Sequence, residues 1–201
     1  MYKDQIQTVS LYVFERKGNT TDEVVRIGVQ DFLARRGEDV NVTEVFRDEK
    51  GAPHLAGDGM PCVSVSHSGD YIVCAVSDEK VGVDLQVIRR YKDETEDEQA
   101  ERLIRLARRF FHPTETEWIE KDTLGRFFTV WSAKEAYVKY TGQGIDDTFG
   151  TVGVIPDGGP YGTEWECGGM YYRLLPLAED YSFCVCGGRP IYTETTFADV
   201  Y

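Results

Sequence analysis

The 201-residue sequence contains no apolar run that approaches the ~20 residues needed to cross a membrane. Its opening segment, MYKDQIQTVS, also lacks the hydrophobic region of a secretory signal. We therefore expect a cytoplasmic protein without a membrane partner. Hydrophobic residues still make up 41% of the chain and aromatic residues 12%, which is enough for a folded core.

Basic residues are scarce. The chain has 22 Lys and Arg against 35 Asp and Glu, for a formal net charge of -13, so nucleic acid is a poor general partner. From Thr141 onward, Arg173 and Arg189 are the only basic residues. One helical stripe concentrates positive charge: Arg102, Arg105 and Arg109, with Arg108 beside it. This stripe is either a solvated face or a docking surface for an acidic partner or for phosphates.

Cysteines are few and are not arranged in pairs. The count of five is odd, and no C-x-x-C motif occurs. Four of them, Cys62, Cys74, Cys184 and Cys186, lie in runs that resemble strands. We expect reduced and mostly buried thiols, because the ligand spacing of a zinc site is missing.

The order of expected elements indicates an α+β fold. We expect strands at Thr8–Arg16, Val42–Arg47, Cys62–Ser66, Tyr71–Ser77, Val81–Val87, Gly150–Ile155, Thr163–Cys167, Met170–Leu175 and Tyr181–Gly187. We expect helices from a Thr20/Glu23 capping box to about Arg36, over Glu98–Phe111, from Pro113, and over Thr123–Tyr140. The three strands at Cys62–Ser66, Tyr71–Ser77 and Val81–Val87, joined by brief links, read as an antiparallel meander. No regular β-α-β alternation is present, so we expect two α+β halves, residues 1–88 and 89–201.

The segment WSAKEAYVKY lies in the last of these helices. Helical positions four apart share a face, so Trp131, Glu135 and Lys139 form one stripe, with Lys134 beside it. A carboxylate between two lysines suits a site that holds a metal ion and phosphates. The alternative is a surface pair of Glu135 and Lys139.

Two other segments carry polar groups on strands. In VGVDLQV, Asp84 and Gln86 share one strand face, and the intervening valine and leucine residues face the core. An acid on an apolar strand requires a partner or a metal, unless it ends the strand in a hydrogen-bonded turn. In SVSHSG, the hydroxyls, His67 and turn amides can receive a phosphate, or form an ordinary turn. Glu115 lies in the first turn of a helix after FFHP, where a carboxylate is stabilised in any case.

Taken together, SHSG, GVD, FF-x-x-x-E, W-S-x-K-E-x-x-x-K and G-x-G resemble, in order and spacing, the 4′-phosphopantetheinyl transferases of the surfactin-synthetase type. The resemblance covers about Lys50 to Ile145. It implies a pseudo-dimeric α+β fold with the site between two similar halves. It also implies that phosphopantetheine moves from coenzyme A to a serine of an apo acyl or peptidyl carrier protein, with Mg²⁺ as cofactor. We expect a monomer.

The resemblance also implies roles for individual residues. Asp84 and Glu135 correspond to metal ligands, and Gln86 takes a position where the family often has a further metal-facing acid. Glu115 corresponds to a residue proposed to help deprotonate the carrier serine. The positions that imply contacts to coenzyme A are Ser66 and His67 for the 3′-phosphate, and Lys134 and Lys139 for the diphosphate or pantetheine arm.

The sequence departs from the family at Gln86, at Gly51-Ala52-Pro53, where G-K-P is usual, and in its short N-terminal segment, which has no clear match to the usual basic residues. Two alternatives therefore remain open. One is an inactive relative that binds coenzyme A or a carrier protein. The other is a metal-dependent diphosphate hydrolase, in which water replaces the serine.

Overall fold

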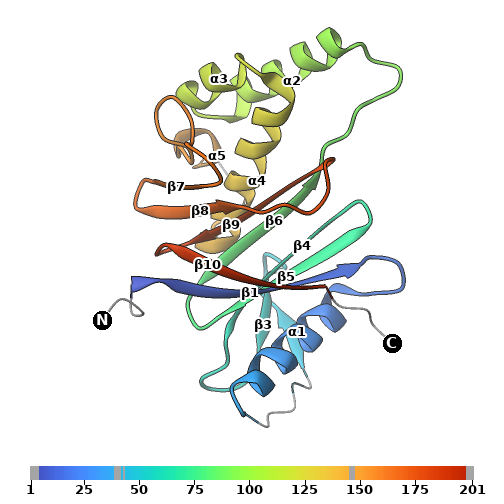
Figure 1. Ribbon diagram of the computed structural model, residues 1–201, viewed down its shortest axis with the longest axis vertical. Helices are drawn as coiled ribbons and strands as arrows, with labels where there is room; N and C mark the ends of the chain where they lie inside the picture. The colour runs from blue at the N-terminus through green and yellow to red at the C-terminus, as the bar shows by residue number, and fades with distance from the viewer. Residues whose placement is uncertain (1–4, 39–41, 43, 145–147, 198–201) are drawn as a thin grey trace.

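The computed structural model describes residues 5–38, 42, 44–144 and 148–197, and it confirms the α+β class. The strands are β1 (Gln7–Glu15), β2 (Val45–Arg47), β3 (Pro53–Leu55), β4 (Cys62–Ser68), β5 (Tyr71–Ser77), β6 (Val81–Val87), β7 (Glu164–Cys167), β8 (Met170–Leu174), β9 (Tyr181–Gly187) and β10 (Ile191–Phe197). The helices are α1 (Thr21–Arg35), α2 (Glu96–Phe110), α3 (Pro113–Ile119), α4 (Thr123–Thr141) and α5 (Thr148–Thr151). Figure 1 shows them in layers: α2 to α4, one sheet, a second sheet, and α1.

The sheet next to α1 has the strand order β10-β1-β5-β4. Alternation along β1 divides its side chains between two cores. Val9, Leu11 and Val13 pack between the two sheets, whereas Tyr12 and Phe14 pack against α1. Each strand face is therefore buried, which explains why β1 reads as a nearly continuous apolar run.

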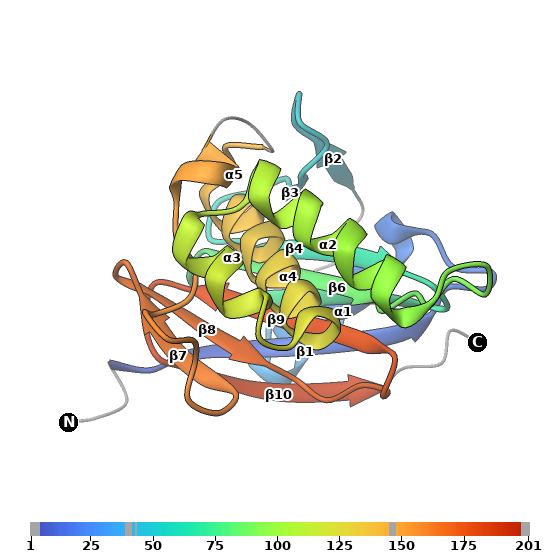
Figure 2. The ribbon, with the colours of Figure 1, turned by 90° about the horizontal axis from the view of Figure 1, so that it is seen from above.

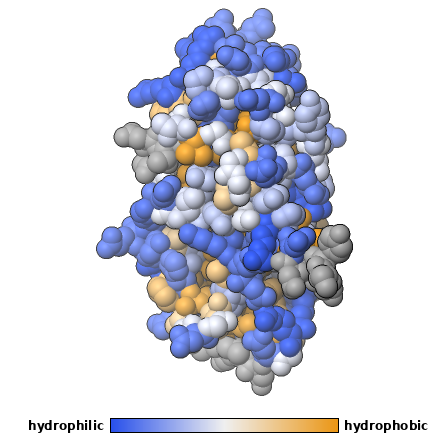
Figure 3. Space-filling view, turned by 90° about the vertical axis from the view of Figure 1, so that its left-hand side faces the viewer, coloured by the Kyte–Doolittle hydropathy of each residue, from blue (hydrophilic) through white to orange (hydrophobic). Residues whose placement is uncertain are grey.

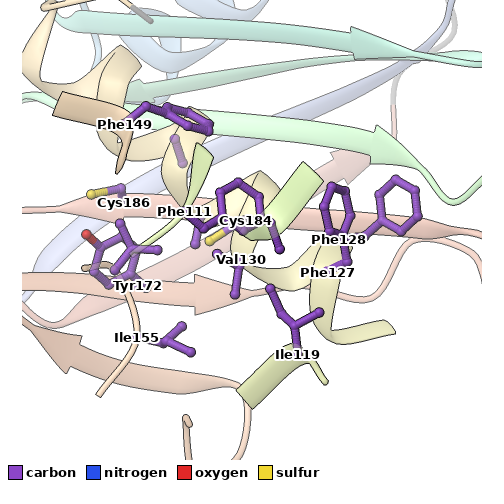
Figure 4. Close-up of a cluster of buried hydrophobic side chains, with 14 of the residues drawn as sticks. Phe111, Ile119, Phe127, Phe128, Val130, Phe149, Ile155, Tyr172, Cys184 and Cys186 are labelled. Carbon is purple, nitrogen blue, oxygen red and sulfur yellow. The ribbon is translucent and has the colours of Figure 1, made fainter. Parts of the chain in front are cut away.

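The other sheet has the strand order β6-β9-β8-β7 and lies under α2, α3 and α4, as the view from above shows (Figure 2). Along β9, Phe183 and Val185 face the core between the sheets. Cys184 and Cys186 face the helices, in a cluster rich in aromatic residues (Figure 4). All five cysteines are free thiols, as expected.

Helix α4 crosses this sheet at Gly82 of β6. A Cβ atom at residue 82 would lie 1.9 Å from the carbonyl oxygen of Ala136 and 2.6 Å from the amide nitrogen of Tyr140. Only a residue without a side chain permits this approach of helix and strand. The contact places α4 next to the face of β6 that carries Gly82, and Asp84 is the next residue on that face.

One expectation about sheet topology is wrong, and one strand was not expected. The Val81–Val87 strand does not complete a meander, because β6 pairs antiparallel with β9 in the other sheet. The sequence also gave no sign of β10, which pairs parallel with β1. Strand β6 thus belongs with the later sheet and β10 with the earlier one, so residue 88 is not the boundary between the two sheets.

Two local expectations also differ from the structure. The strand expected at Gly150–Ile155 is absent there, since α5 covers its start and Val154 bonds to side chains: its N–H donates to Glu115 and its carbonyl accepts from Trp165. Of the strand expected at Val42–Arg47, the part Val45–Arg47 forms β2; residue 43 lies outside the described residues. Strand β2 pairs with β3, which falls in a segment expected to be a loop.

On the face drawn in Figure 3, hydrophilic residues predominate and hydrophobic residues appear in small separate groups. Among the described residues, no helix is both long and apolar enough to span a membrane.

Candidate functional site

The two sheets meet along their edge strands β4 and β6, and serine hydroxyls join them. Ser64 Oγ accepts a hydrogen bond from the Val83 amide at 3.1 Å, and Ser68 Oγ accepts one from the Val87 amide at 3.0 Å. These side chains replace the backbone ladder that two neighbouring strands would otherwise form. The result is a polar seam between the two sheets.

A cavity of about 680 Å³ opens along this seam. Its walls come from β4, β6, the exposed stripe of α4, the β2–β3 hairpin and the start of α1. The sequence-predicted residues that line it are Ser66, His67, Asp84, Gln86, Glu135 and Lys139. Trp131 lines it as well, so the predicted stripe of Trp131, Glu135 and Lys139 does face one site.

Asp84 is the most constrained of these groups, because only 5% of its surface is exposed. Its Oδ1 accepts hydrogen bonds from Ser66 Oγ and from Lys139 Nζ, each at 2.8 Å. Its Oδ2 is buried and has no hydrogen-bond partner among the described residues. A buried carboxylate oxygen without a partner is costly, so this atom is suited to a ligand that carries positive charge.

Glu135 supplies a second carboxyl group beside Asp84. Burial and the negative charge of Asp84 raise the pKa of Glu135 from an ordinary 4.5 to about 7, and the Lys139 charge offsets part of this rise. No hydrogen bond or ion pair satisfies Glu135 within the described part of the chain. Two adjacent carboxylates without enough positive charge are the usual sign of a place for a cation.

These residues fit a divalent cation that brings other ligands with it. Among the described residues, no group of three His, Cys, Asp or Glu side chains is arranged as a metal cluster. Mg²⁺ is commonly held by one or two carboxylates and completes its octahedron with water and substrate phosphate oxygens. Gln86 lines the same cavity, and its Nε2 donates to the Val87 carbonyl at 3.2 Å.

His67 lies on the cavity wall next to the seam. Desolvation of the ring, together with the positive charges of Arg16 and Lys139, lowers the pKa of His67 below its usual 6.5. The free imidazole is therefore neutral at pH 7, and it offers a phosphate one N–H donor until the bound anion draws a proton onto it.

Lys134 and Glu115 lie elsewhere, in contrast to the roles that the resemblance implied. Their side chains are 2% and 0% exposed and form an ion pair of 2.9 Å between α4 and α3. Lys134 also donates to the carbonyls of Phe149 and Val152, and Glu115 accepts from the amides of His112 and Val154. Neither residue lines the cavity. Adjacent helical residues point about 100° apart, so Lys134 faces the core while Glu135 faces the cavity.

Two cationic residues of the cavity wall, Arg47 and Lys50, were not among the predicted site residues. Arg47 donates to the Gly51 carbonyl at 2.8 Å and pairs with Asp22, while Lys50 donates to the carbonyls of Gly142 and Gln143 at 2.8 Å. Lys50 stands directly before Gly51-Ala52-Pro53, so its place in the chain was a usable signal. No sequence signal pointed to Arg47, because only the pairing of β2 with β3 brings it to the cavity.

The arginine stripe of α2 is largely neutralised by neighbouring acids. Arg102 forms an ion pair with Glu94 at 3.0 Å, Arg105 with Glu101 at 3.7 Å, and Arg108 with Glu120 at 2.6 Å. The Arg109 guanidinium lies over the Phe110 ring, 5.0 Å from its centroid. The stripe is thus a weaker docking surface than its sequence suggested.

A family model described as the 4′-phosphopantetheinyl transferase superfamily matches residues 80–186, which is more than half of the chain. This range includes Asp84, Gln86, Glu135 and Lys139, the cavity residues of β6 and α4.

Curated relatives are similar over shorter or more divergent stretches. A 4′-phosphopantetheinyl transferase of Bacillus subtilis is 28% identical over 153 residues, covering 73% of this chain and 63% of the relative. The transferase Sfp of Bacillus subtilis strain 168 is 25% identical over 159 residues, covering 68% and 62%. The transferase gsp of Aneurinibacillus migulanus is 33% identical over 86 residues, covering 41% and 32%. The chain therefore spans less than two thirds of the length of these relatives.

Proposed function

The chain belongs to the 4′-phosphopantetheinyl transferase superfamily, and from this premise we propose that it moves phosphopantetheine from coenzyme A to a serine of an apo acyl or peptidyl carrier protein. The other product is 3′,5′-ADP. The observation that carries the proposal is the unpartnered Oδ2 of Asp84, which lies in the same cavity as Glu135 and Lys139.

Asp84 and Glu135 are the residues that would hold Mg²⁺, with Gln86 beside them. When bound, Mg²⁺ supplies positive charge that stabilises the diphosphate as its phosphorus is attacked. Lys139 now neutralises Asp84, and in the complex it can turn its three donors towards the diphosphate. Phosphoryl transfer demands mainly positioning and charge stabilisation, which these side chains offer.

The remaining cavity residues suit the nucleotide end of coenzyme A. His67 offers a donor for the 3′-phosphate, and Arg47 and Lys50, which line the same cavity, add positive charge. Glu115 is buried in its ion pair, so we assign it the support of α4 and not the proton of the carrier serine. A monomer, a cytoplasmic location and the absence of a nucleic-acid partner stay predictions.

The test combines the purified protein with coenzyme A, Mg²⁺ and an apo carrier protein, followed by intact mass spectrometry of the carrier and quantification of 3′,5′-ADP. We expect the carrier to gain one phosphopantetheine, on its acceptor serine, and Asp84→Asn to abolish this gain. Release of 3′,5′-ADP without carrier would instead indicate the diphosphate hydrolase. Binding of coenzyme A without turnover would indicate the inactive relative.

A further inference from the structure

The three serines of β4 that face β6 do not have the same partners. Ser64 and Ser68 accept hydrogen bonds from backbone amides of β6. Ser66, which lies between them, instead donates to the Asp84 carboxylate at 2.8 Å. Ser66 is 7% exposed and Asp84 is 5% exposed, so this hydrogen bond is shielded from water. Its partner is the one buried carboxylate of β6, and not the strand itself.

This hydrogen bond makes the two oxygens of Asp84 unequal. Ser66 and Lys139 both bind Oδ1, and Oδ2 is left without a partner among the described residues. The two donors differ in mobility. The Lys139 side chain is long and 28% exposed, so it can leave, whereas the short Ser66 side chain is buried and fixed to the backbone of β4. Ser66 is therefore the contact that persists when the charge around Asp84 changes.

The direction of the hydrogen bond decides what Ser66 can do. A serine hydroxyl has one proton, and here that proton is donated to Asp84. The hydroxyl can then only accept a hydrogen bond, and an ionised phosphate oxygen has no proton to donate to it. While this bond exists, Ser66 cannot donate to the 3′-phosphate of coenzyme A, which is the role that the resemblance implied.

We propose that Ser66 is a positioning residue for the metal site: it holds Asp84 Oδ1 so that Oδ2 is presented to the divalent cation. The inference rests on the proposed function, since it assigns a task within the same site. Groups that orient metal ligands typically affect metal affinity by about 10–100-fold. A contribution within this range is expected of the Ser66 hydroxyl.

The experiment measures binding of Mn²⁺, as a spectroscopic substitute for Mg²⁺, to the full chain by electron paramagnetic resonance, without coenzyme A. Ser66→Ala removes the donor, Ser66→Thr keeps it, and Ser68→Ala is the matched control, because it removes a β4–β6 hydrogen bond that does not reach Asp84. Steady-state assays then determine the Mg²⁺ concentration for half-maximal transfer, kcat, and the preference for coenzyme A over dephospho-coenzyme A.

We expect Ser66→Ala to weaken Mn²⁺ binding about 10-fold or more and to raise the Mg²⁺ requirement by a similar factor. Its kcat at saturating Mg²⁺ and its preference for the 3′-phosphate should stay close to those of the wild type. Ser66→Thr should restore metal affinity, and Ser68→Ala should leave it unchanged.

Three results would overturn the inference. Equal Mn²⁺ binding by Ser66→Ala and the wild type would show that the hydroxyl does not position Asp84. Equal losses in Ser66→Ala and Ser68→Ala would show that these serines act only by joining the strands. A selective loss of 3′-phosphate preference in Ser66→Ala would show that Ser66 contacts the 3′-phosphate of coenzyme A. Failure of the wild type to modify a carrier would instead reject the proposed function, and the inference with it.

Discussion

Replacing Glu135 with glutamine should make the metal-free protein more stable at alkaline pH while abolishing its proposed activity. The folded protein raises the pKa of Glu135 from 4.5 to about 7, chiefly by burial and by the charge of Asp84. A group with a raised pKa stabilises the fold below its unfolded pKa, and this contribution is lost as the pH rises through its folded pKa. The window is therefore about pH 4.5 to 7.

The size of the effect follows from the two pKa values. One pKa unit corresponds to about 1.4 kcal/mol, so ionising Glu135 in the fold costs about 3 kcal/mol at most. The cavity is open to water, and solvent screening reduces this cost to about 1–3 kcal/mol. Glutamine resembles the neutral acid in shape and carries no charge, so Glu135→Gln should remove this cost above pH 7 and change little near pH 5.

The assay is urea unfolding at pH 5 and pH 8.5 with a chelator present, using Glu117→Gln as an exposed control on α3. We expect Glu135→Gln to exceed the wild type in unfolding free energy only at pH 8.5. Adding Mg²⁺ should then stabilise the wild type more than the variant, because only the wild type keeps both carboxylates. A variant that is less stable than the wild type at pH 8.5, or that differs equally at both pH values, would refute the reasoning.

Four other changes test separate parts of the structure. Gly82→Ala should destabilise the fold by about 1–3 kcal/mol or more, measured by urea unfolding, because its new methyl group meets α4 backbone at 1.9 Å. Glu115→Gln should cost about 3–5 kcal/mol in the same assay by leaving Lys134 buried without its counter-ion, and a double variant with Lys134→Met should recover part of the loss. His67→Ala should weaken binding of coenzyme A more than of dephospho-coenzyme A in calorimetry; equal losses would contradict the 3′-phosphate contact. Gln86→Glu should lower the Mg²⁺ concentration for half-maximal transfer, and an unchanged or higher midpoint would place residue 86 away from the metal.

Strand and helix periodicity predicted the parts of the site that depend on one element. A period of two put Asp84 and Gln86 on one face, and the i to i+4 spacing put Trp131, Glu135 and Lys139 on one stripe; all five line the cavity. Neither the strand period nor the helical spacing predicts which other element packs against a given face. For that reason the sequence did not show that Ser66 meets Asp84.

The errors arose where tertiary contacts decide. Lys134 stands next to a cavity residue in the sequence, yet its helical angle points it into the core, where Glu115 and two carbonyls receive its charge. Strand β6 follows β5 after a short link, which favours a meander, but its partner is β9, about 100 residues further along. Strand β10 has exposed polar residues on much of its length, so it lacked the hydrophobic pattern that identified the others.

The exchange of β6 and β10 between the two sheets has a consequence for biosynthesis. Gln7 of β1 pairs with Ile191 of β10, so the sheet that contains β1 cannot be completed until β10 has been synthesised. Strand β6 likewise cannot pair until β9 has been synthesised. Contacts this distant in the sequence form slowly, and an unpaired edge of β1 is open to association with other chains in the meantime. We expect the nascent chain to stay incompletely folded until synthesis has passed β10, and the finished protein to unfold as one cooperative unit and not half by half.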